Sequence, residues 1–350
     1  MKGHYNMSRK KAEQELIREI VKRTKKKSAV RKAVDLAVGT GLCAGAGVMV
    51  GIANYFYDFS MKPIRRDTSR DNEPDEQPYM TGRKWMNTHP EKKDWYERAE
   101  DGLRIHANYI PSPVKGGDHR FALCVHGYSD SAESMGVYAM VYRDVYGMNV
   151  VMPDLRGHGK SEGTYVGYGY HERRDIIIWI DRILQIDPEA VIILHGISMG
   201  AATVMMVTGE KLPSNVKACI EDSGFSTAME EFAHVFGTLK KKPPISSDFL
   251  LPILKNIGIL RAGYNLNDAS PLDAVKRSIT PTLFIHGEAD SFIPCSMMTK
   301  LFEAASCEKM CMLVPKAEHV KSVVQDPEGY WAKIESFLKL VDPQLVERKA

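Results

Sequence analysis

The sequence predicts an α/β protein in which a mostly parallel sheet carries helices on both of its faces. Short apolar runs, several of them rich in β-branched residues and typical of buried strands, recur from about residue 121 onward. Stretches with the apolar spacing of amphipathic helices separate these runs. Because parallel strands need long crossover connections, which helices usually supply, this alternation indicates a parallel sheet between two layers of helices.

The predicted domain covers residues 94–345 and begins with a β-hairpin. Residues 94–99 and 103–110 are strand-like, and the sequence between them, Glu100-Asp101-Gly102, is typical of a turn. The elements expected next are a strand at 121–125, a helix at 134–146, a strand at 149–152, a helix at 171–184, a strand at 191–194 followed directly by a helix, and a strand at 216–220.

Residues 224–270 interrupt this alternation with helical pieces and many large apolar side chains. We therefore expect a small lid that is inserted over the functional site. The alternation then resumes, and it predicts a strand at 282–286, a helix at 297–305, a strand at 309–314 and a final helix at 330–341.

The N-terminal part of the chain differs from the predicted domain in charge. Residues 1–35 form a polar tail, and its first 32 residues hold twelve Lys and Arg against three Glu. Since the whole chain has a net charge of +3, an excess of +9 in the tail leaves −6 for the remainder. The basic character belongs to the tail and not to the domain, which argues against a nucleic-acid-binding fold.

Residues 36–57 carry no charged side chain. As a helix they would extend roughly 33 Å, enough to cross a bilayer core of about 30 Å, and they predict one transmembrane helix. The alternative is a small-residue helix packed on the domain. Because the basic side is N-terminal, we expect a cytoplasmic N-terminus and the predicted domain outside the cell membrane. Residues 58–93 are largely polar and predict a linker.

The sequence predicts neither a metal nor another cofactor. The six cysteines form no C-x-x-C pair and have no zinc-ligand spacing. The sequence around Gly157-His158-Gly159-Lys160-Ser161 has Asp154 where a phosphate-binding loop needs glycine. We therefore expect no nucleotide site.

Residues 196–200 spell Gly-Ile-Ser-Met-Gly between a predicted strand and a predicted helix. In this context a G-x-S-x-G sequence indicates a sharp turn that presents a nucleophilic serine, here Ser198. Gly196 and Gly200 leave room, because a Cβ at either position would press on the neighbouring strand or helix. The alternative is an ordinary glycine-rich turn.

A serine nucleophile needs a base, and the base needs a carboxylate that fixes its tautomer. Asp290 and His319 follow the predicted strands at 282–286 and 309–314, in the chain order Ser, Asp, His. We therefore predict Asp290 as the orienting acid and His319 as the base. Glu288 and Glu318 are the nearest alternatives to Asp290.

Acyl transfer also needs hydrogen-bond donors for the oxyanion. We expect one from the backbone N–H of Met199, directly after the nucleophile. The other is expected from the backbone N–H of Tyr128, in the turn after the strand at 121–125. The Tyr128 side chain either lines the acyl pocket or simply packs.

Several other polar residues near these turns are expected to be structural. His126, His195 and His286 each end a predicted strand before a glycine, and we expect them to brace the backbone of the loops. Arg156 is expected to pair with Asp175 and to brace the turn that follows the strand at 149–152.

Five ordered motifs between about residues 95 and 341 resemble the α/β-hydrolase superfamily, and more narrowly its bacterial serine aminopeptidase-like and monoacylglycerol lipase-like hydrolases. The resemblance implies the α/β-hydrolase fold and a metal-free serine hydrolase that acts through an acyl-enzyme intermediate. It does not fix the substrate, because such proteins cleave esters, lipids, thioesters or peptides. The motifs are His126-Gly127-Tyr128, residues 154–161 (Asp-Leu-Arg-Gly-His-Gly-Lys-Ser), residues 196–200, Gly287-Glu288-Ala289-Asp290 and Glu318-His319.

The sequence thus predicts a membrane-anchored serine hydrolase of the esterase or lipase kind, acting on a small acyl substrate. A serine peptidase that removes residues from short peptides and an acyltransferase remain open alternatives with the same three residues. A scaffold without catalytic activity is the alternative from another class, and the presence of Ser198, Asp290 and His319 argues against it.

Overall fold

The computed structural model describes residues 78–238 and 247–347, together with Gly51, Asn54, Tyr55, Tyr57, Asp58 and residues 60–63. The expected tail at 1–35 and most of the expected transmembrane helix at 36–57 lie outside these residues. In the part of the chain that is described, no helix is both long enough and apolar enough to cross a membrane.

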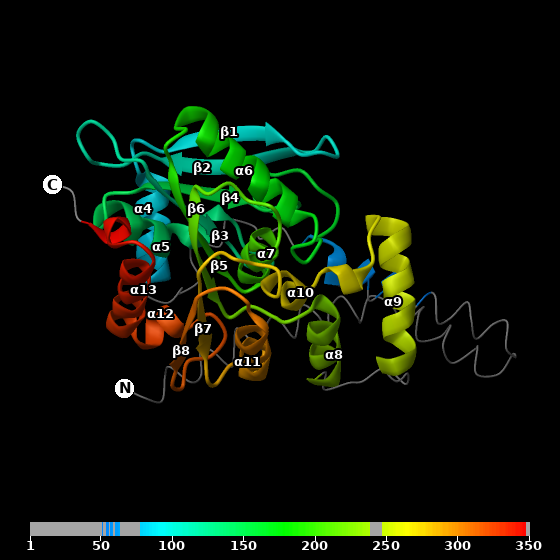
Figure 1. Ribbon diagram of the computed structural model, residues 1–350. Helices are drawn as coiled ribbons and strands as arrows, with labels where there is room; N and C mark the ends of the chain where they lie inside the picture. Colours follow the sequence, from blue (N-terminus) through cyan, green and yellow to red (C-terminus); the bar gives the residue numbers. More distant parts are fainter. Residues whose placement is uncertain are drawn as a thin grey trace, which may run out of the picture.

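An eight-stranded sheet forms the centre of the domain, in the order β1-β2-β4-β3-β5-β6-β7-β8 (Figure 1). The first hairpin is antiparallel, and β2 is also antiparallel to β4, whereas all later neighbours are parallel. The mostly parallel sheet is therefore confirmed. Its strands are β1 (Lys93–Arg98), β2 (Arg104–Ile110), β3 (Arg120–Val125), β4 (Asn149–Asp154), β5 (Val191–Ile197), β6 (Val216–Asp222), β7 (Thr282–Gly287) and β8 (Lys309–Val314).

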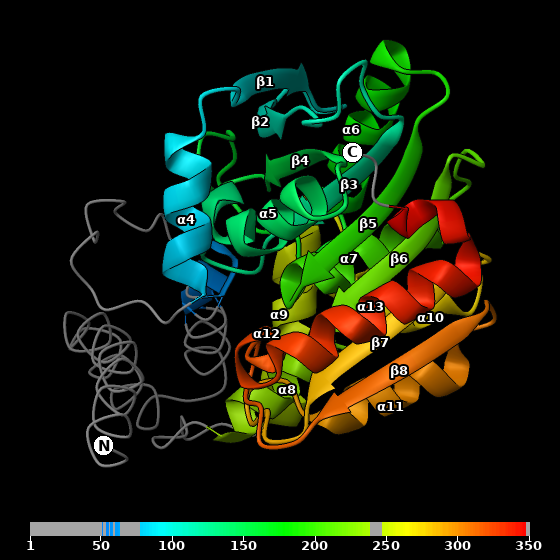
Figure 2. The same cartoon turned by 90° about the vertical axis from the view of Figure 1, so that its left-hand side faces the viewer.

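Helices cover both faces of the sheet, as the alternation of strands and helices predicts (Figure 2). Two large groups of buried apolar side chains, one on each face, form the core. One face carries α4 (Tyr79–Thr88), η1 (Ala132–Met135), α5 (Gly136–Asp144), α12 (Ser322–Gln325), α13 (Pro327–Val341) and η3 (Pro343–Val346). The other face carries α6 (Glu172–Ile186), α7 (Met199–Thr208), α10 (Pro271–Val275) and α11 (Cys295–Ala304).

The most deeply buried unit of this architecture is β5 with the helix α7 that follows it. All ten residues of α7 are buried, and the helix contacts both β5 and β6. Because this helix is apolar on every side, it is fixed by packing around its whole circumference. The turn between β5 and α7 therefore has a rigid support.

The residues expected to form a lid contain α8 (Ala228–Thr238), α9 (Ser247–Ala262) and η2 (Leu266–Asp268). This insertion begins directly after β6, which runs parallel to β5. It therefore leaves the sheet at the same edge as the turn before α7, and Figure 1 shows α8 and α9 projecting beyond the sheet.

Helix α4 lies inside the stretch expected to be a linker, residues 58–93, and it packs closely against α5. A Cβ on Gly82 would lie 2.2 Å from the backbone nitrogen of Val137, and one on Gly136 would lie 2.2 Å from the carbonyl oxygen of Gly82. The two glycines let the helices approach to backbone contact. This packing depends on the absence of a side chain at both glycines, so no apolar pattern in the sequence predicts it.

Candidate active site

Ser198 lies at the sharp turn between β5 and α7, with φ 54° and ψ −120°. Such a conformation is strained for a residue with a side chain, and the surroundings hold it. A Cβ on Gly196 would lie 2.3 Å from the carbonyl oxygen of Gly200, and one on Gly200 would lie 2.1 Å from that of Val125. The Ser198 N–H donates to the carbonyl oxygen of Asp222 at 2.8 Å. The glycines and β6 together fix the backbone conformation of this buried serine.

The structure brings Ser198, His319 and Asp290 together. The His319 Nε2 lies 2.9 Å from the Ser198 Oγ, and its Nδ1 lies 2.7 Å from the Asp290 Oδ2. A carboxylate only accepts, so Nδ1 carries a proton and donates it to Asp290. In the neutral ring Nε2 is then an acceptor that faces the serine hydroxyl. This arrangement can take a proton from Ser198.

Asp290 is held by more than its bond to His319. Its Oδ1 accepts from the backbone N–H groups of Phe292 and Ile293, each at 2.9 Å. Its Oδ2 also lies 3.3 Å from the Nε2 of buried His286. Burial alone would raise the pKa of Asp290, but the hydrogen bonds from His286 and His319 lower it well below its ordinary value. The acid is therefore ionised at neutral pH, while Glu288 in the same loop is exposed.

The two residues predicted to supply oxyanion donors lie close to Ser198. Met199 follows it directly in the chain, and Tyr128 belongs to a turn that approaches it in space. Met199 is the first residue of α7, whose N-terminal N–H groups have no acceptor within the helix. The turn that contains Tyr128 touches the serine, because a Cβ on Gly127 would lie 3.1 Å from the Ser198 Cβ. The Tyr128 hydroxyl donates to the carbonyl oxygen of Ser60 at 3.0 Å.

His126 and His286 brace loops as predicted, and His195 does not. His126 donates from Nδ1 to the Gly127 carbonyl oxygen at 2.7 Å and accepts at Nε2 from the Leu155 N–H at 3.0 Å. The His286 Nε2 lies 2.9 Å from the carbonyl oxygen of Ile293, in the Asp290 loop.

The ring of His195 contacts side chains of the core and not the backbone of a loop. It lies 3.0 Å from the hydroxyl of Tyr142 and 3.1 Å from that of Tyr330. Burial lowers the pKa of His195 to about 3, so the ring is neutral there. His195 lies inside β5, which continues through Gly196 to Ile197, and its ring points into the helical layer that contains Tyr142 and Tyr330.

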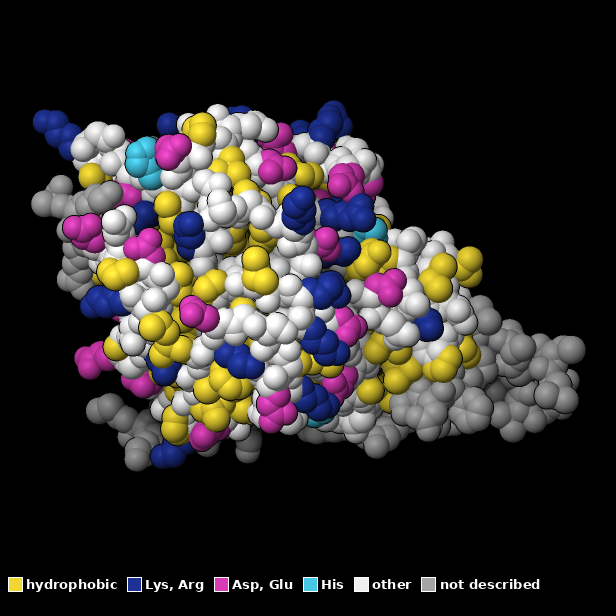
Figure 3. All heavy atoms as spheres, viewed as in Figure 1, with side chains coloured by type: hydrophobic (Ala, Val, Ile, Leu, Met, Phe, Trp, Pro, Cys, Tyr) yellow, Lys and Arg dark blue, Asp and Glu magenta, His cyan; other side chains and the backbone are white. Residues whose placement is uncertain are grey.

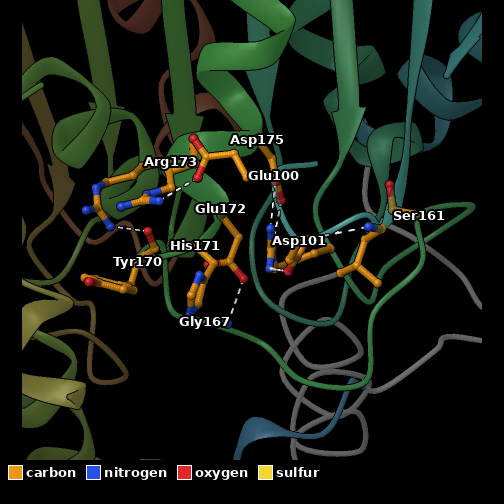
Figure 4. Close-up of polar contacts among 12 residues, drawn as sticks. Glu100, Asp101, Ser161, Gly167, Tyr170, His171, Glu172, Arg173 and Asp175 are labelled. Atoms are coloured by element: carbon orange, nitrogen blue, oxygen red, sulfur yellow. Dashed lines mark hydrogen bonds and ion pairs between the residues drawn. The ribbon is translucent and has the colours of Figure 1, made fainter. Parts of the chain in front are cut away.

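The predicted pair of Arg156 and Asp175 is present and bidentate, at 2.8 and 2.7 Å. Arg156 also donates to Asp101 at 2.8 Å, which ties the turn after β4 to the first hairpin. Figure 4 shows the neighbouring contact, in which Glu172 of α6 accepts from the Gly167 N–H at 2.7 Å. These contacts fix the loop that leads from β4 to α6.

A group of aromatic side chains near the serine was not predicted from the sequence. The ring centroid of Tyr168 lies 5.9 Å from that of Tyr128, 4.7 Å from that of Phe232 and 6.3 Å from that of Phe225. The Tyr168 hydroxyl donates to the carbonyl oxygen of Ser60 at 2.9 Å. Tyr128 thus belongs to an aromatic wall built from three separate parts of the chain, which no local signal could reveal.

The site contains no visible arrangement for a metal. Over residues 78–238 and 247–347 and the few described positions before them, no group of three or more His, Cys, Asp or Glu side chains could hold an ion. The arrangement of Ser198, His319 and Asp290 itself needs no metal to move a proton.

The fold and this site define an α/β hydrolase. A family model described as "Alpha/beta hydrolase family" matches residues 122–333, more than half of the chain. The chain therefore belongs to the α/β-hydrolase family, as the five motifs indicate.

Relatives at the sequence level include proteins described as uncharacterized. YqkD of Bacillus subtilis (strain 168) is 29% identical over 214 residues, which cover 61% of this chain and 69% of that protein. A membrane protein of Saccharomyces cerevisiae, YNL320W, is 26% identical over 213 residues, which cover 59% of this chain and 68% of that protein.

Solved structures with this fold include an esterase and a peptidase. The esterase Pf2001 of Pyrococcus furiosus has a TM-score of 0.57 at 23% identity, covering 72% of this chain and 91% of its own. The acylaminoacyl peptidase of Pyrococcus horikoshii has a TM-score of 0.54 at 20% identity, covering 74% of this chain and 42% of its own. At these identities the likeness establishes the fold alone.

Proposed function

We propose that this protein is a serine hydrolase that cleaves an ester or amide acyl bond through an acyl-enzyme intermediate. The observation that carries the proposal is the continuous hydrogen-bonded chain from the Ser198 Oγ through His319 to Asp290. A surface histidine and a turn serine would not need a buried, fully hydrogen-bonded carboxylate behind them. The strained turn at Ser198 is a second argument, because strain of this kind concentrates at functional sites.

In the first half of the reaction, the Ser198 Oγ attacks the acyl carbon while His319 Nε2 takes the hydroxyl proton. Asp290 stabilises the imidazolium that forms and does not itself take a proton. The negative charge develops on the acyl oxygen, where the backbone N–H groups of Met199 and Tyr128 are proposed to donate. His319 then gives its proton to the leaving alcohol or amine.

In the second half, water attacks the acyl carbon of the ester formed with Ser198. His319 takes a proton from that water and returns it to the Ser198 Oγ as the acid leaves. An alcohol in place of water would make the protein an acyltransferase, and an amine leaving group would make it a peptidase. Both alternatives use the same three residues.

Labelling with a fluorophosphonate probe tests the proposal. We expect the wild-type protein to be labelled and Ser198→Ala to be neither labelled nor active, because only an activated serine hydroxyl displaces fluoride from the probe. Ser291→Ala is the matched control, since this serine is exposed in the loop next to Asp290. Labelling of Ser198→Ala equal to that of the wild type would reject the nucleophile.

We also propose that the chain is held at the cell membrane by residues 36–57, with the N-terminus cytoplasmic and the domain outside. The residues that follow this stretch contact the domain, since Asp58 pairs with Arg261 of α9 at 2.8 Å and the Ser60 carbonyl oxygen accepts from Tyr128, beside the site, at 3.0 Å. Two apolar side chains near the end of α9 are exposed, Ile259 to 45% and Leu260 to 83%, which suits a position beside a membrane (Figure 3).

The orientation is tested with a membrane-impermeant maleimide on intact cells. Cys311 is free and exposed on β8. We expect it to be labelled without lysis if the domain lies outside, and Cys311→Ser identifies the signal. Labelling of Cys311 only after lysis would contradict the orientation, and recovery of the full-length chain in the soluble fraction would contradict the anchor.

A further inference from the structure

Glu231, on the insertion helix α8, is a buried acid without a hydrogen-bond partner in the described part of the chain. Its residue is only 4% exposed. Neither of its carboxylate oxygens has a hydrogen-bond partner among the described residues. No step of the proposed reaction uses this carboxylate, and no pattern in the sequence distinguishes it from other acids on helices.

Glu231 lies beside the site. Its pKa is raised by burial first and then by the negative charge of Asp290, while its own charge raises the pKa of Tyr168 in the aromatic wall. The next residue on the helix, Phe232, packs on Tyr168. His234, one turn further along, contacts the carbonyl oxygen of Ser291 at 3.0 Å. Helix α8 therefore spans from the aromatic wall to the loop that carries Asp290.

The neighbouring acid shows that this helix can satisfy a carboxylate when one is needed for structure. Glu230 accepts from the Ser226 hydroxyl at 2.5 Å and forms an ion pair with Lys300. Glu231 has neither kind of contact among the described residues, and burying an unsatisfied carboxylate costs free energy. Since apolar side chains of the same size would fill this position without that cost, a ligand that supplies hydrogen-bond donors explains the acid.

We propose that Glu231 binds a primary ammonium group of the substrate, so that the enzyme prefers acyl substrates that carry an amino group. An ammonium has three N–H donors, and it can satisfy both oxygens of the carboxylate and compensate its charge. A quaternary ammonium has no N–H and would leave the oxygens unsatisfied. The rings of Tyr168 and Phe232 beside the acid also favour a cation over an anion.

This inference rests on the proposed serine-hydrolase function but is tested by binding, which needs no turnover. Titration calorimetry of the full-length protein, at about pH 9, compares straight-chain alkylammonium chlorides of graded length with alcohols of the same length. Burial raises the pKa of Glu231 to about 8, so the acid is ionised at about pH 9. The alkylammonium is also charged at this pH, because its pKa is close to that of a lysine side chain.

We expect the best alkylammonium to bind about tenfold to a hundredfold more tightly than the alcohol of its length, which is the strength of a hydrogen bond to a charged group. Glu231→Gln should remove this preference and leave the affinity for the alcohol unchanged. Glu230→Gln should keep the preference, because Glu230 already has partners. Retained fluorophosphonate labelling of each variant shows that its site is folded.

Equal affinities of the wild-type protein for the ammonium and the alcohol would overturn the proposal, whatever the variants do. An equal loss of preference in Glu230→Gln and Glu231→Gln would overturn it too, because a diffuse negative field would then explain the binding. Failure of the hydrolase proposal has a different signature, since the probe would not label Ser198 while the ammonium still binds.

Discussion

The carboxylate of Asp290, on the loop after β7, and that of Glu231, on α8 of the insertion, are both buried. Asp290 accepts from two backbone N–H groups and from His319. Glu231 has no hydrogen-bond partner for either oxygen among the described residues. Burial opposes the ionised form of Asp290, but hydrogen bonds from His286 and His319 lower its pKa below the ordinary value, while burial and the charge of Asp290 raise the pKa of Glu231 to about 8.

The difference separates two kinds of functional acid. The charge of Asp290 is required before any ligand arrives, so the fold itself supplies the donors that stabilise it. The charge proposed for Glu231 is required only when a substrate is bound, and the donors are then supplied by that substrate. The rigid sheet edge holds the first acid, and the inserted helix holds the second.

The largest expected effect is the loss of turnover when Asp290 is replaced, which tests whether its charge is needed before a ligand arrives. Asp290→Asn should keep the fold, because an amide oxygen still accepts from Phe292 and Ile293, but it no longer fixes the His319 tautomer. Loss of the tautomer typically lowers kcat by about 10⁴-fold. The hydrolysis of a neutral p-nitrophenyl ester measures this change.

Glu288→Gln is the control for that variant, because Glu288 is exposed in the same loop. Turnover of Asp290→Asn within a few-fold of the wild type, or an equal loss in Glu288→Gln, would assign the orienting role elsewhere.

The fold could be predicted because its signals are local. Most strands after the first hairpin are apolar runs bounded by turn residues, and the serine turn is a strand, two glycines and a helix in direct succession. The packing of α4 could not be predicted, because it depends on Gly82 meeting Gly136. An absent side chain has no periodic signal, and its partner lies far away in the sequence.

The site could be predicted as far as chain order determines it. Asp290 and His319 follow adjacent parallel strands, so their side chains reach the same edge of the sheet. Glu230 and Glu231 could not be distinguished, because adjacent residues of the same type on an amphipathic helix look alike. They differ only in the folded protein, where Glu230 pairs with the distant Lys300 and Glu231 is buried.

A smaller effect is expected on the melting temperature of the protein without ligand, which ionisation of Glu231 lowers. An acid whose pKa is raised on folding, here to about 8, destabilises the native state progressively as the pH rises from its unfolded value, about 4.5, to about 8. Glu231→Gln removes this titration. We therefore expect the variant to have the same Tm as the wild type near pH 4.5 and a higher one at about pH 8, by roughly 2 °C or more.

Calorimetric melting of both proteins across this pH range measures the difference, with Glu230→Gln as the matched control. Glu230 is ion-paired with Lys300, which lowers its pKa, although burial opposes this. Its replacement should therefore lower the Tm, or leave it unchanged, at neutral pH. A Tm of Glu231→Gln below that of the wild type at pH 8 would mean that the acid has a structural partner in the empty protein. In that case the contrast between the two buried carboxylates would disappear, and with it the reason to assign Glu231 to a ligand.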